Sequence, residues 1–277
     1  MVQEIGSRIA EKRKERGMTQ KKLAEQLNVT FQAVSKWEKG ISAPDISLLP
    51  LIAFHLHTSV DALLGYPHVS RTKYEERYKG EAYYWGVEPN HTCYEIMKLK
   101  PPVKAYRVLD IGCGEGKDAV FFAKCGYRVS AFDLAESGLE KARDLARLNQ
   151  VEIDFFQADM NTYEPEGMFD IIFSSGSMHY IPAKKRKQFM ENLKKHTAEN
   201  GIHAIKLFVQ KPFVEPAPDR EEAEREVEPW YSGELMGYYR DWLIHRTDEF
   251  IFDCSRATLY GPHKHCMNVV IAQKYKG

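Results

Sequence analysis

Three glycines at alternate positions follow an apolar run near the middle of the chain, and they mark the stretch whose residue types could bind a ligand. Residues 108–111 form the apolar run, Gly112, Gly114 and Gly116 follow, and residues 118–123 continue with a helix-compatible pattern. This arrangement predicts a buried strand, a tight turn and a helix that packs back on the strand. Such a turn brings bare backbone close to the ligand.

Acidic side chains around this turn indicate what kind of ligand it accepts. Asp110, Glu115 and Asp118 surround it, and its glycines are spaced G-x-G-x-G instead of the G-x-G-x-x-G of dinucleotide-binding loops. Carboxylates would repel a phosphate but attract a cation. The ligand that fits is S-adenosylmethionine, which carries an ammonium and a sulfonium group together with a ribose.

Two later acidic residues have the spacing expected of the same site. Asp133 ends the apolar segment 127–132, about 20 residues after the turn, where nucleotide-binding sheets place the acid that binds ribose hydroxyls. Asp159 follows a predicted strand at residues 153–157. Ligands of parallel sheets bind at the carboxyl ends of the strands, so we expect Asp110, Asp133 and Asp159 to lie along one edge.

Strands and helices alternate over the second part of the chain. The predicted strands are residues 108–111, 127–133, 153–157, 169–175 and 202–209, with helices at 118–123, 139–148 and 183–196 and a closing antiparallel hairpin of 248–254 and 267–273. This order predicts an α/β fold, with a mostly parallel seven-stranded sheet and helices on both faces. Residues 67–75 have turn residues without periodicity and are predicted to link residues 1–66 to a domain of residues 76–277.

Composition limits the partners and the compartment. The 277 residues include 39 Lys and Arg against 39 Asp and Glu, so the chain as a whole points to neither a nucleic-acid nor a membrane partner. It has no signal pattern and no apolar run near the roughly 20 residues that span a bilayer, so we expect a soluble, cytoplasmic protein. The five cysteines lack C-x-x-C spacing, which favours reduced thiols over disulfides or a metal site.

Residues 1–66 predict a bundle of five short helices. Thr19 and Thr30 can cap the second and third helices, and the period of the third buries Val34 and Trp37. Met18-Thr19-Gln20, residues 34–40 and Pro44 make this segment resemble the lambda-repressor type of helix-turn-helix domain. The resemblance implies that the third helix enters the major groove of double-stranded DNA.

Specific DNA contacts follow from the outward side chains. Gln32 can read adenine, and Lys36 can reach guanine or phosphate. The resemblance implies that Gln20 contacts a backbone phosphate and braces the third helix. The predicted DNA-binding residues are Gln20, Thr30, Phe31, Gln32, Ser35 and Lys36. Because the local excess of positive charge is small, we expect a homodimer on DNA, and a protein-contact role for the bundle stays open.

Several short blocks accompany the glycine turn. They are residues 84–86, 132–133, 158–159, 174–176, 211–213, 232–235, 238–239, Trp242, 262–263 and His265. From residue 78 to residue 274 the chain thereby resembles class I S-adenosylmethionine-dependent methyltransferases, and more closely the tellurite-resistance methyltransferase family. The resemblance implies a Rossmann-like fold and methyl transfer to a small acceptor, either a tellurite- or selenite-like oxyanion or a thiol.

The resemblance also implies roles for residues. The turn would hold the methionine part of the cofactor, Asp133 its ribose, and Asp159 with Met160 its adenine. The full predicted cofactor-binding set is Asp110, Gly112, Cys113, Gly114, Gly116, Asp133, Leu134, Asp159, Met160 and Ser175. Aromatic residues at 74–85 either cover the edge of the sheet or close over the ligand.

An oxyanion acceptor needs hydrogen-bond donors. The predicted catalytic residues are His179, Tyr180, His263 and His265, although the last two could instead lie in a solvent-facing turn. The sequence lacks the N-P-P-Y or P-C block that base-modifying methyltransferases carry after the fourth strand, which disfavours a DNA methyltransferase. The helix-turn-helix segment indicates a transcriptional regulator, and the alternative function is a repressor that senses S-adenosylmethionine through a catalytically idle domain.

Overall fold

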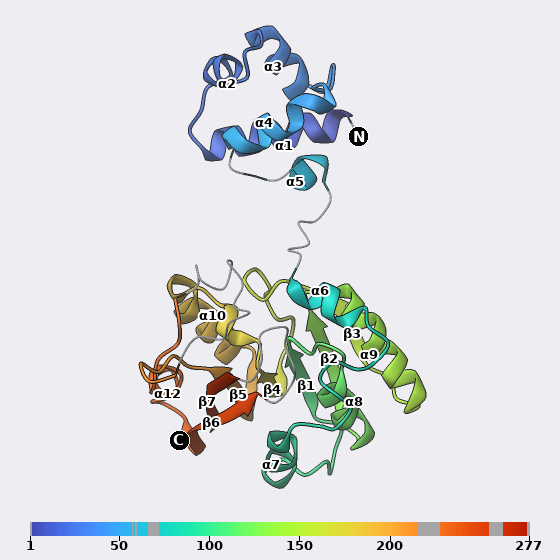
Figure 1. Ribbon diagram of the computed structural model, residues 1–277, viewed down its shortest axis with the longest axis vertical. Helices are drawn as coiled ribbons and strands as arrows, with labels where there is room; N and C mark the ends of the chain where they lie inside the picture. Colours follow the sequence, from blue (N-terminus) through green and yellow to red (C-terminus); the bar gives the residue numbers. More distant parts are fainter. Residues whose placement is uncertain are drawn as a thin grey trace. The chain divides into compact units, whose positions relative to one another are not determined.

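Two units divide the chain in the computed structural model, one formed by residues 1–70 and the other by residues 71–277 (Figure 1). The structure describes residues 2–56, 58, 60–65, 72–214, 228–254 and 263–275. Residues 67–71 of the predicted linker and Pro262 lie outside the described residues. The linker was predicted to extend too far, because residues 73–75 belong to helix α6 (Lys73–Tyr78), whose first turn is capped by Thr72.

The first unit is the predicted all-helical bundle. Thr19 and Thr30 each accept a hydrogen bond from the backbone N–H three residues on, at 3.1 and 3.2 Å, and so begin the second and third helices. Asp45 caps the predicted fourth helix, which starts with a 3-10 turn. The elements are α1 (Val2–Glu15), α2 (Gln20–Gln26), α3 (Phe31–Glu38), η1 (Ile46–Leu48), α4 (Leu49–Leu56) and α5 (Val60–Leu64).

A buried ion pair fixes α3 against α1. Arg13 of α1 donates from Nε to Oε1 of Glu38 at 2.6 Å, and Gln20 of α2 donates to the other carboxylate oxygen at 2.7 Å. Burial by itself would raise the pKa of Glu38, but the hydrogen bonds from Arg13 and Gln20 outweigh it and lower that pKa. The apolar core beside this pair includes Ile9, Leu23, Val34, Trp37 and Ile52.

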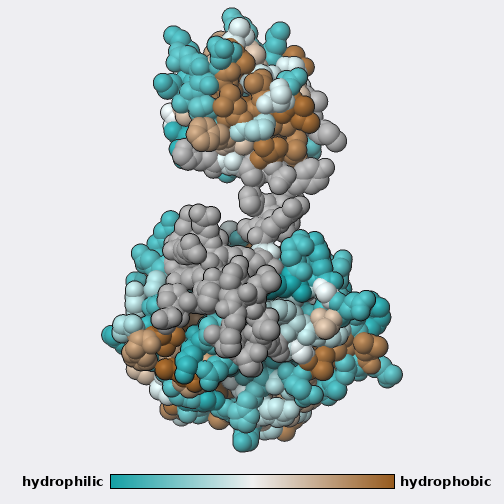
Figure 2. Space-filling view, viewed as in Figure 1, coloured by the Kyte–Doolittle hydropathy of each residue, from teal (hydrophilic) through white to brown (hydrophobic). Residues whose placement is uncertain are grey.

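Apolar and polar side chains share the surface of the first unit. Figure 2 shows both kinds on the face in view. The large exposed apolar side chains of this unit are Phe31, Ile41, Ile46, Leu51 and Phe54. In the described part of the chain, no helix is both long and apolar enough to cross a membrane.

Seven strands form one sheet in the second unit, in the order β3-β2-β1-β4-β5-β7-β6 (Figure 1). The first five strands run parallel, and β7 runs antiparallel to both β5 and β6. The strands are β1 (Arg107–Ile111), β2 (Arg128–Asp133), β3 (Asp154–Gln157), β4 (Phe169–Ser175), β5 (Thr197–Phe208), β6 (Leu243–Cys254) and β7 (His263–Gln273). The predicted fold class is confirmed, and the strand order reverses between β1 and β4, where open α/β sheets bind ligands.

Helices cover both faces of this sheet. Helices α7 (His91–Leu99) and α8 (Lys117–Lys124) bury Ile96 and Phe122 against one face. Helices α10 (Ala183–Lys195) and α12 (Glu234–Gly237) bury Leu193 and Leu235 against the other. Helix α9 (Glu136–Leu148) packs beside α8, and the 3-10 turn η2 (Met178–Tyr180) follows β4.

Three strands begin earlier than the sequence predicts. Strands β5, β6 and β7 begin at Thr197, Leu243 and His263 instead of residues 202, 248 and 267. The turn expected at His263 and His265 is wrong, because both residues pair with β6 as part of β7. The first residues of these three strands are held by backbone hydrogen bonds to the neighbouring strands. Their side chains do not alternate between apolar and polar, and this alternation is the pattern by which a strand is predicted from sequence.

Candidate active site

The glycine turn lies where β1 meets α8. Gly112, Gly114 and Gly116 have φ angles of +71°, +55° and +81°, in the left-handed region that favours glycine. A Cβ on Gly116 would lie 2.6 Å from Cβ of Ala142 in α9, so α9 packs directly on the turn. Gly112 and Cys113 both donate their backbone N–H to the carbonyl of Phe132 in β2, at 2.9 and 3.0 Å. The turn is thereby fixed on both sides.

Asp110 lies directly before this turn and is enclosed by the protein. Its side chain is 2 % exposed, and within the described residues its Oδ2 atom has no hydrogen-bond partner. Burial raises the pKa of Asp110 well above its ordinary value, and the carboxylates of Asp118 and Asp133 add to the effect. Buried polar atoms are normally hydrogen-bonded. The arrangement therefore fits a ligand that brings a positive charge to the turn, as the ammonium group of S-adenosylmethionine would.

Asp133 connects the end of β2 to the turn. One carboxylate oxygen accepts the N–H of Gly114 at 2.8 Å and the other accepts the N–H of Ala135 at 2.9 Å. Burial raises the pKa of Asp133, although these hydrogen bonds act in the opposite direction. A carboxylate has about four acceptor sites, so Asp133 can still accept hydrogen bonds from ribose hydroxyls.

The residues predicted to hold adenine follow β3. The backbone N–H of Ala158 donates to the carbonyl of Asp133 at 3.1 Å, which brings the ends of β2 and β3 together. Asp159 accepts two hydrogen bonds from Asn161, and Met160 packs against the apolar core. Leu134 accepts a hydrogen bond from the side chain of Gln157 through its carbonyl, at 2.9 Å. The structure thus gathers these predicted residues along one edge of the sheet.

Glu115 was expected to attract the ligand, but the structure gives it another partner. It is 1 % exposed, accepts the backbone N–H groups of Tyr84 and Trp85 at 3.0 and 3.1 Å, and pairs with Lys141 at 2.7 Å. The physical reason is that a buried carboxylate takes the nearest donors, and here the protein supplies them.

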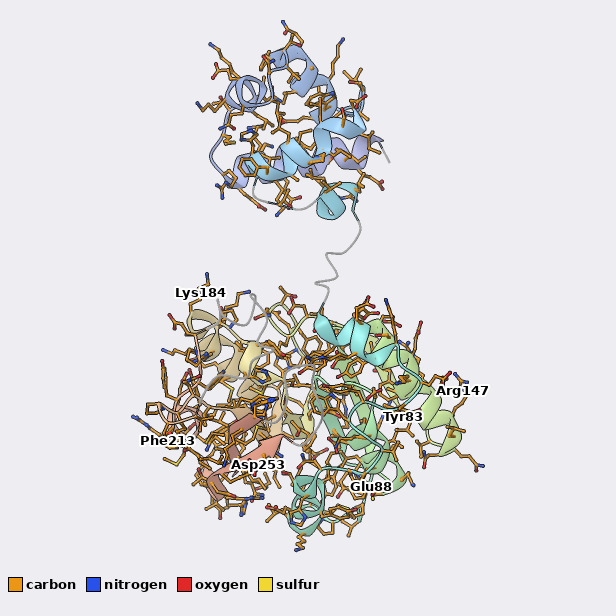
Figure 3. All side chains as sticks on the ribbon, in the orientation of Figure 1. Tyr83, Glu88, Arg147, Lys184, Phe213 and Asp253 are labelled. Carbon is orange, nitrogen blue, oxygen red and sulfur yellow. The ribbon has the colours of Figure 1, made fainter. Side chains whose placement is uncertain are left out.

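Asp118 has an equivalent role one helical turn later. Its Oδ1 atom accepts the backbone N–H of Asn90 at 2.6 Å and pairs with Lys117 at 3.0 Å. Glu115 and Asp118 therefore anchor residues 83–90, the cap segment, across the glycine turn. Figure 3 labels Tyr83 and Glu88 of this cap segment. The sequence analysis assigned no role to Asn90, although its position directly before α7 is typical of a helix cap.

The aromatic residues before the first strand lie over the turn as well. Tyr78 of α6 is buried beside Gly114, and its hydroxyl accepts the indole N–H of Trp85 at 3.0 Å. The ring of Tyr74 lies 5.6 Å from that of Tyr78 and 6.5 Å from that of Tyr180. These contacts place α6 and the cap segment at the ligand-binding edge of the sheet.

The four predicted catalytic residues lie in one row along the ends of β4, β5 and β7. The rings of His179 and Tyr180 are 4.1 Å apart, and His179 lies 4.7 Å from Phe208. Phe208 is also 4.7 Å from His265, whose Nε2 lies 2.9 Å from Nε2 of His263. Phe208, which sequence reasoning missed, joins the two predicted pairs.

At the cap segment, Asn90 donates a hydrogen bond to the hydroxyl of Ser175, a predicted cofactor-binding residue, at 3.0 Å.

The predicted DNA-contact residues lie on and around α3. Phe31, Gln32 and Lys36 are exposed, and Ser35 is half-buried. Thr30 caps the helix, and Val34 and Trp37 face the core, as predicted. Gln20 braces α3 through Glu38. The exposed face of α3 is therefore available to a groove of DNA.

Two glycine substitutions would test how closely the turn is packed. Gly116→Ala should lower the free energy of unfolding of the second unit by roughly 1–2 kcal/mol for the left-handed backbone, and by a further ~1–3 kcal/mol for the contact with Ala142. Gly126→Ala is the matched control, because Gly126 has φ +92° and open space around it. Hydrogen exchange of the backbone amides of β1 and β2 in the full-length protein measures the loss of stability in each of the two variants. Equal losses would show that α9 does not constrain the turn.

Comparison with known proteins agrees with this geometry. Residues 108–201 match a methyltransferase domain family, and residues 9–63 match a helix-turn-helix family. The crystal structure of TehB from Haemophilus influenzae is 20 % identical with a TM-score of 0.58, over 73 % of this chain and 65 % of that one. This similarity shows the fold.

Curated relatives match shorter stretches. The ubiquinone biosynthesis O-methyltransferase of Rickettsia conorii is 29 % identical over 40 % of this chain and 38 % of its own length. The probable S-adenosyl-L-methionine-dependent methyltransferase TehB of H. influenzae is 22 % identical over 56 % of each chain. The chain thus spans less than two thirds of the length of these relatives. It combines a helix-turn-helix domain at its N-terminus with a methyltransferase domain of Rossmann-like fold.

Proposed function

We propose that the second unit is a methyltransferase that uses S-adenosylmethionine and acts on a small acceptor. The observation that carries this proposal is the enclosed carboxylate of Asp110 beneath a turn of three left-handed glycines. A cationic ligand held by backbone atoms suits this arrangement, whereas a pyrophosphate would be repelled. Asp133 at the end of the neighbouring strand supports the same ligand, because its carboxylate can bind ribose hydroxyls.

When bound, the cofactor supplies a methyl group that its sulfonium makes electrophilic. The protein's task is then to align donor and acceptor and to exclude water. The glycine turn and Asp133 bind the cofactor. The cap segment shields the cofactor from water, since Glu115 and Asp118 anchor that segment across the turn. His179, Tyr180, His263 and His265 line the acceptor side, where they can donate hydrogen bonds to an oxyanion or a thiol.

The first unit is proposed to bind double-stranded DNA as a homodimer and to regulate transcription. Gln32 and Lys36 on the exposed face of α3 support base and phosphate contacts. The exposed apolar side chains of α4, Leu51 and Phe54, suit contact with a second copy. Presence in the cytoplasm belongs to the same proposal.

The cofactor site can be tested by calorimetry with S-adenosylhomocysteine. Asp110→Asn should weaken binding by at least about tenfold, because it removes the negative charge beneath the turn. Asp154→Asn is the matched control, because Asp154 lies exposed at the opposite end of a strand. Since the pKa of Asp110 is raised, its proton competes with the ligand, so affinity should increase as pH rises and binding should release protons. Equal affinity in both variants would sink the site assignment.

Turnover separates the enzyme from its alternative. Release of S-adenosylhomocysteine from S-adenosylmethionine should occur with at least one of tellurite, selenite and a thiol. A protein that binds the cofactor tightly but methylates none of them would instead be a sensor that controls the DNA-binding unit.

DNA binding has its own test. Gln32→Ala and Lys36→Ala should each weaken specific binding by roughly 1–3 kcal/mol if both residues contact bases. Gln20→Ala should weaken specific and non-specific binding alike, because Gln20 braces α3 and would contact phosphate. Selection from random DNA should enrich two-fold-related half-sites about one helical turn apart. Enrichment of no such site would mean that the bundle contacts proteins.

A further inference from the structure

Lys206 lies near the carboxyl end of β5, two residues before Phe208, whose ring lies between those of His179 and His265. Its backbone pairs with Ser175 of β4, and its carbonyl accepts the N–H of Gly176 at 2.8 Å. Ile205 and Leu207 on either side pack into the core against α10. Because side chains alternate along a strand, Lys206 projects from the opposite face, which is also the face of Phe208.

The ammonium group of Lys206 is half-buried and faces charges of both signs. It lies 5.4 Å from the ring centroid of Phe250. Burial lowers the pKa of Lys206, the positive charges of Lys117 and Arg246 lower it further, and Asp118 acts in the opposite direction. Asp118 is already bound to Asn90 and Lys117. The half-buried ammonium would gain a favourable electrostatic interaction from a negatively charged ligand beside it.

We propose that Lys206 binds the negatively charged part of the methyl acceptor, so that the acceptor is a small anion. This inference rests on the proposed methyltransferase function and specifies the substrate class of the same site. Lys206 supplies the positive charge, and the neighbouring row from His179 to His263 supplies directional hydrogen bonds. The charge selects among acceptors, because a neutral acceptor of the same size gains nothing from it.

Two thiols that differ in charge provide the probe. Mercaptoacetate carries a carboxylate and 2-mercaptoethanol does not, while both offer the same sulfur. In either reaction the acceptor sulfur forms a bond to the methyl carbon as the sulfonium C–S bond breaks. The electron pair of that bond stays on the sulfur of S-adenosylhomocysteine, and the thiol proton leaves to solvent.

Lys206→Met should lower kcat/KM for mercaptoacetate by about tenfold or more and leave that for 2-mercaptoethanol within about twofold. Lys206→Arg should restore most of the preference, because the positive charge returns. Lys184→Met is the matched control, since Lys184 is exposed at the start of α10 and is labelled in Figure 3. All variants should bind S-adenosylhomocysteine as the wild type does.

If neither thiol is methylated, the affinity of the acceptor anions for the protein tests the inference instead of turnover. Mercaptoacetate and selenite should bind the wild-type complex with S-adenosylhomocysteine and lose affinity in Lys206→Met. Equal losses for the charged and neutral thiols, no loss for either, or no binding of these anions to the wild-type complex would overturn the inference. Failure of the wild type to bind S-adenosylhomocysteine would instead remove the proposed function on which the inference rests.

Discussion

A buried carboxyl group, one oxygen of which has no hydrogen-bond partner among the described residues, is the constraint around which the second unit is organised. Enclosing an ionised carboxylate costs several kcal/mol unless a partner compensates. Burial raises the pKa of Asp110 for this reason, at the end of β1, where the strand order reverses and the backbone turns through three left-handed glycines. Such a cost is typical of functional sites, which give up stability for a ligand. The packing of α9 on the turn and the hydrogen bonds from the turn to β2 hold the turn in position.

Residues of the same type serve different purposes within a few positions of each other. Asp110 is enclosed, and its Oδ2 atom has no hydrogen-bond partner among the described residues, whereas Glu115 and Asp118 bind backbone N–H groups of the cap segment. The difference arises from what lies opposite each carboxylate. Two of the three acids around the turn therefore position the protein's own chain, and the attraction for a cation rests on Asp110 with Asp133.

The sequence was sufficient to predict which segments form the parallel strands, and that the glycine turn and Asp133 lie at the same edge of the sheet. Buried parallel strands leave continuous apolar runs, and the turn and its acids are consecutive in the chain. The acceptor side depends on the sheet order. His179 and His265 approach each other because β7 inserts between β5 and β6, with Phe208 between the two histidines. Lys206 and Asn90 were missed for the same reason, since their roles depend on neighbours distant in sequence.

A crystal structure of the protein with S-adenosylhomocysteine would test the central claim most directly. The account predicts that the ligand lies on the glycine turn, with its ammonium group beside Asp110 and its ribose hydroxyls bonded to Asp133. The cap segment should remain anchored by Glu115 and Asp118. A ligand bound elsewhere, or one bound with its ammonium away from Asp110 and its ribose away from Asp133, would contradict it.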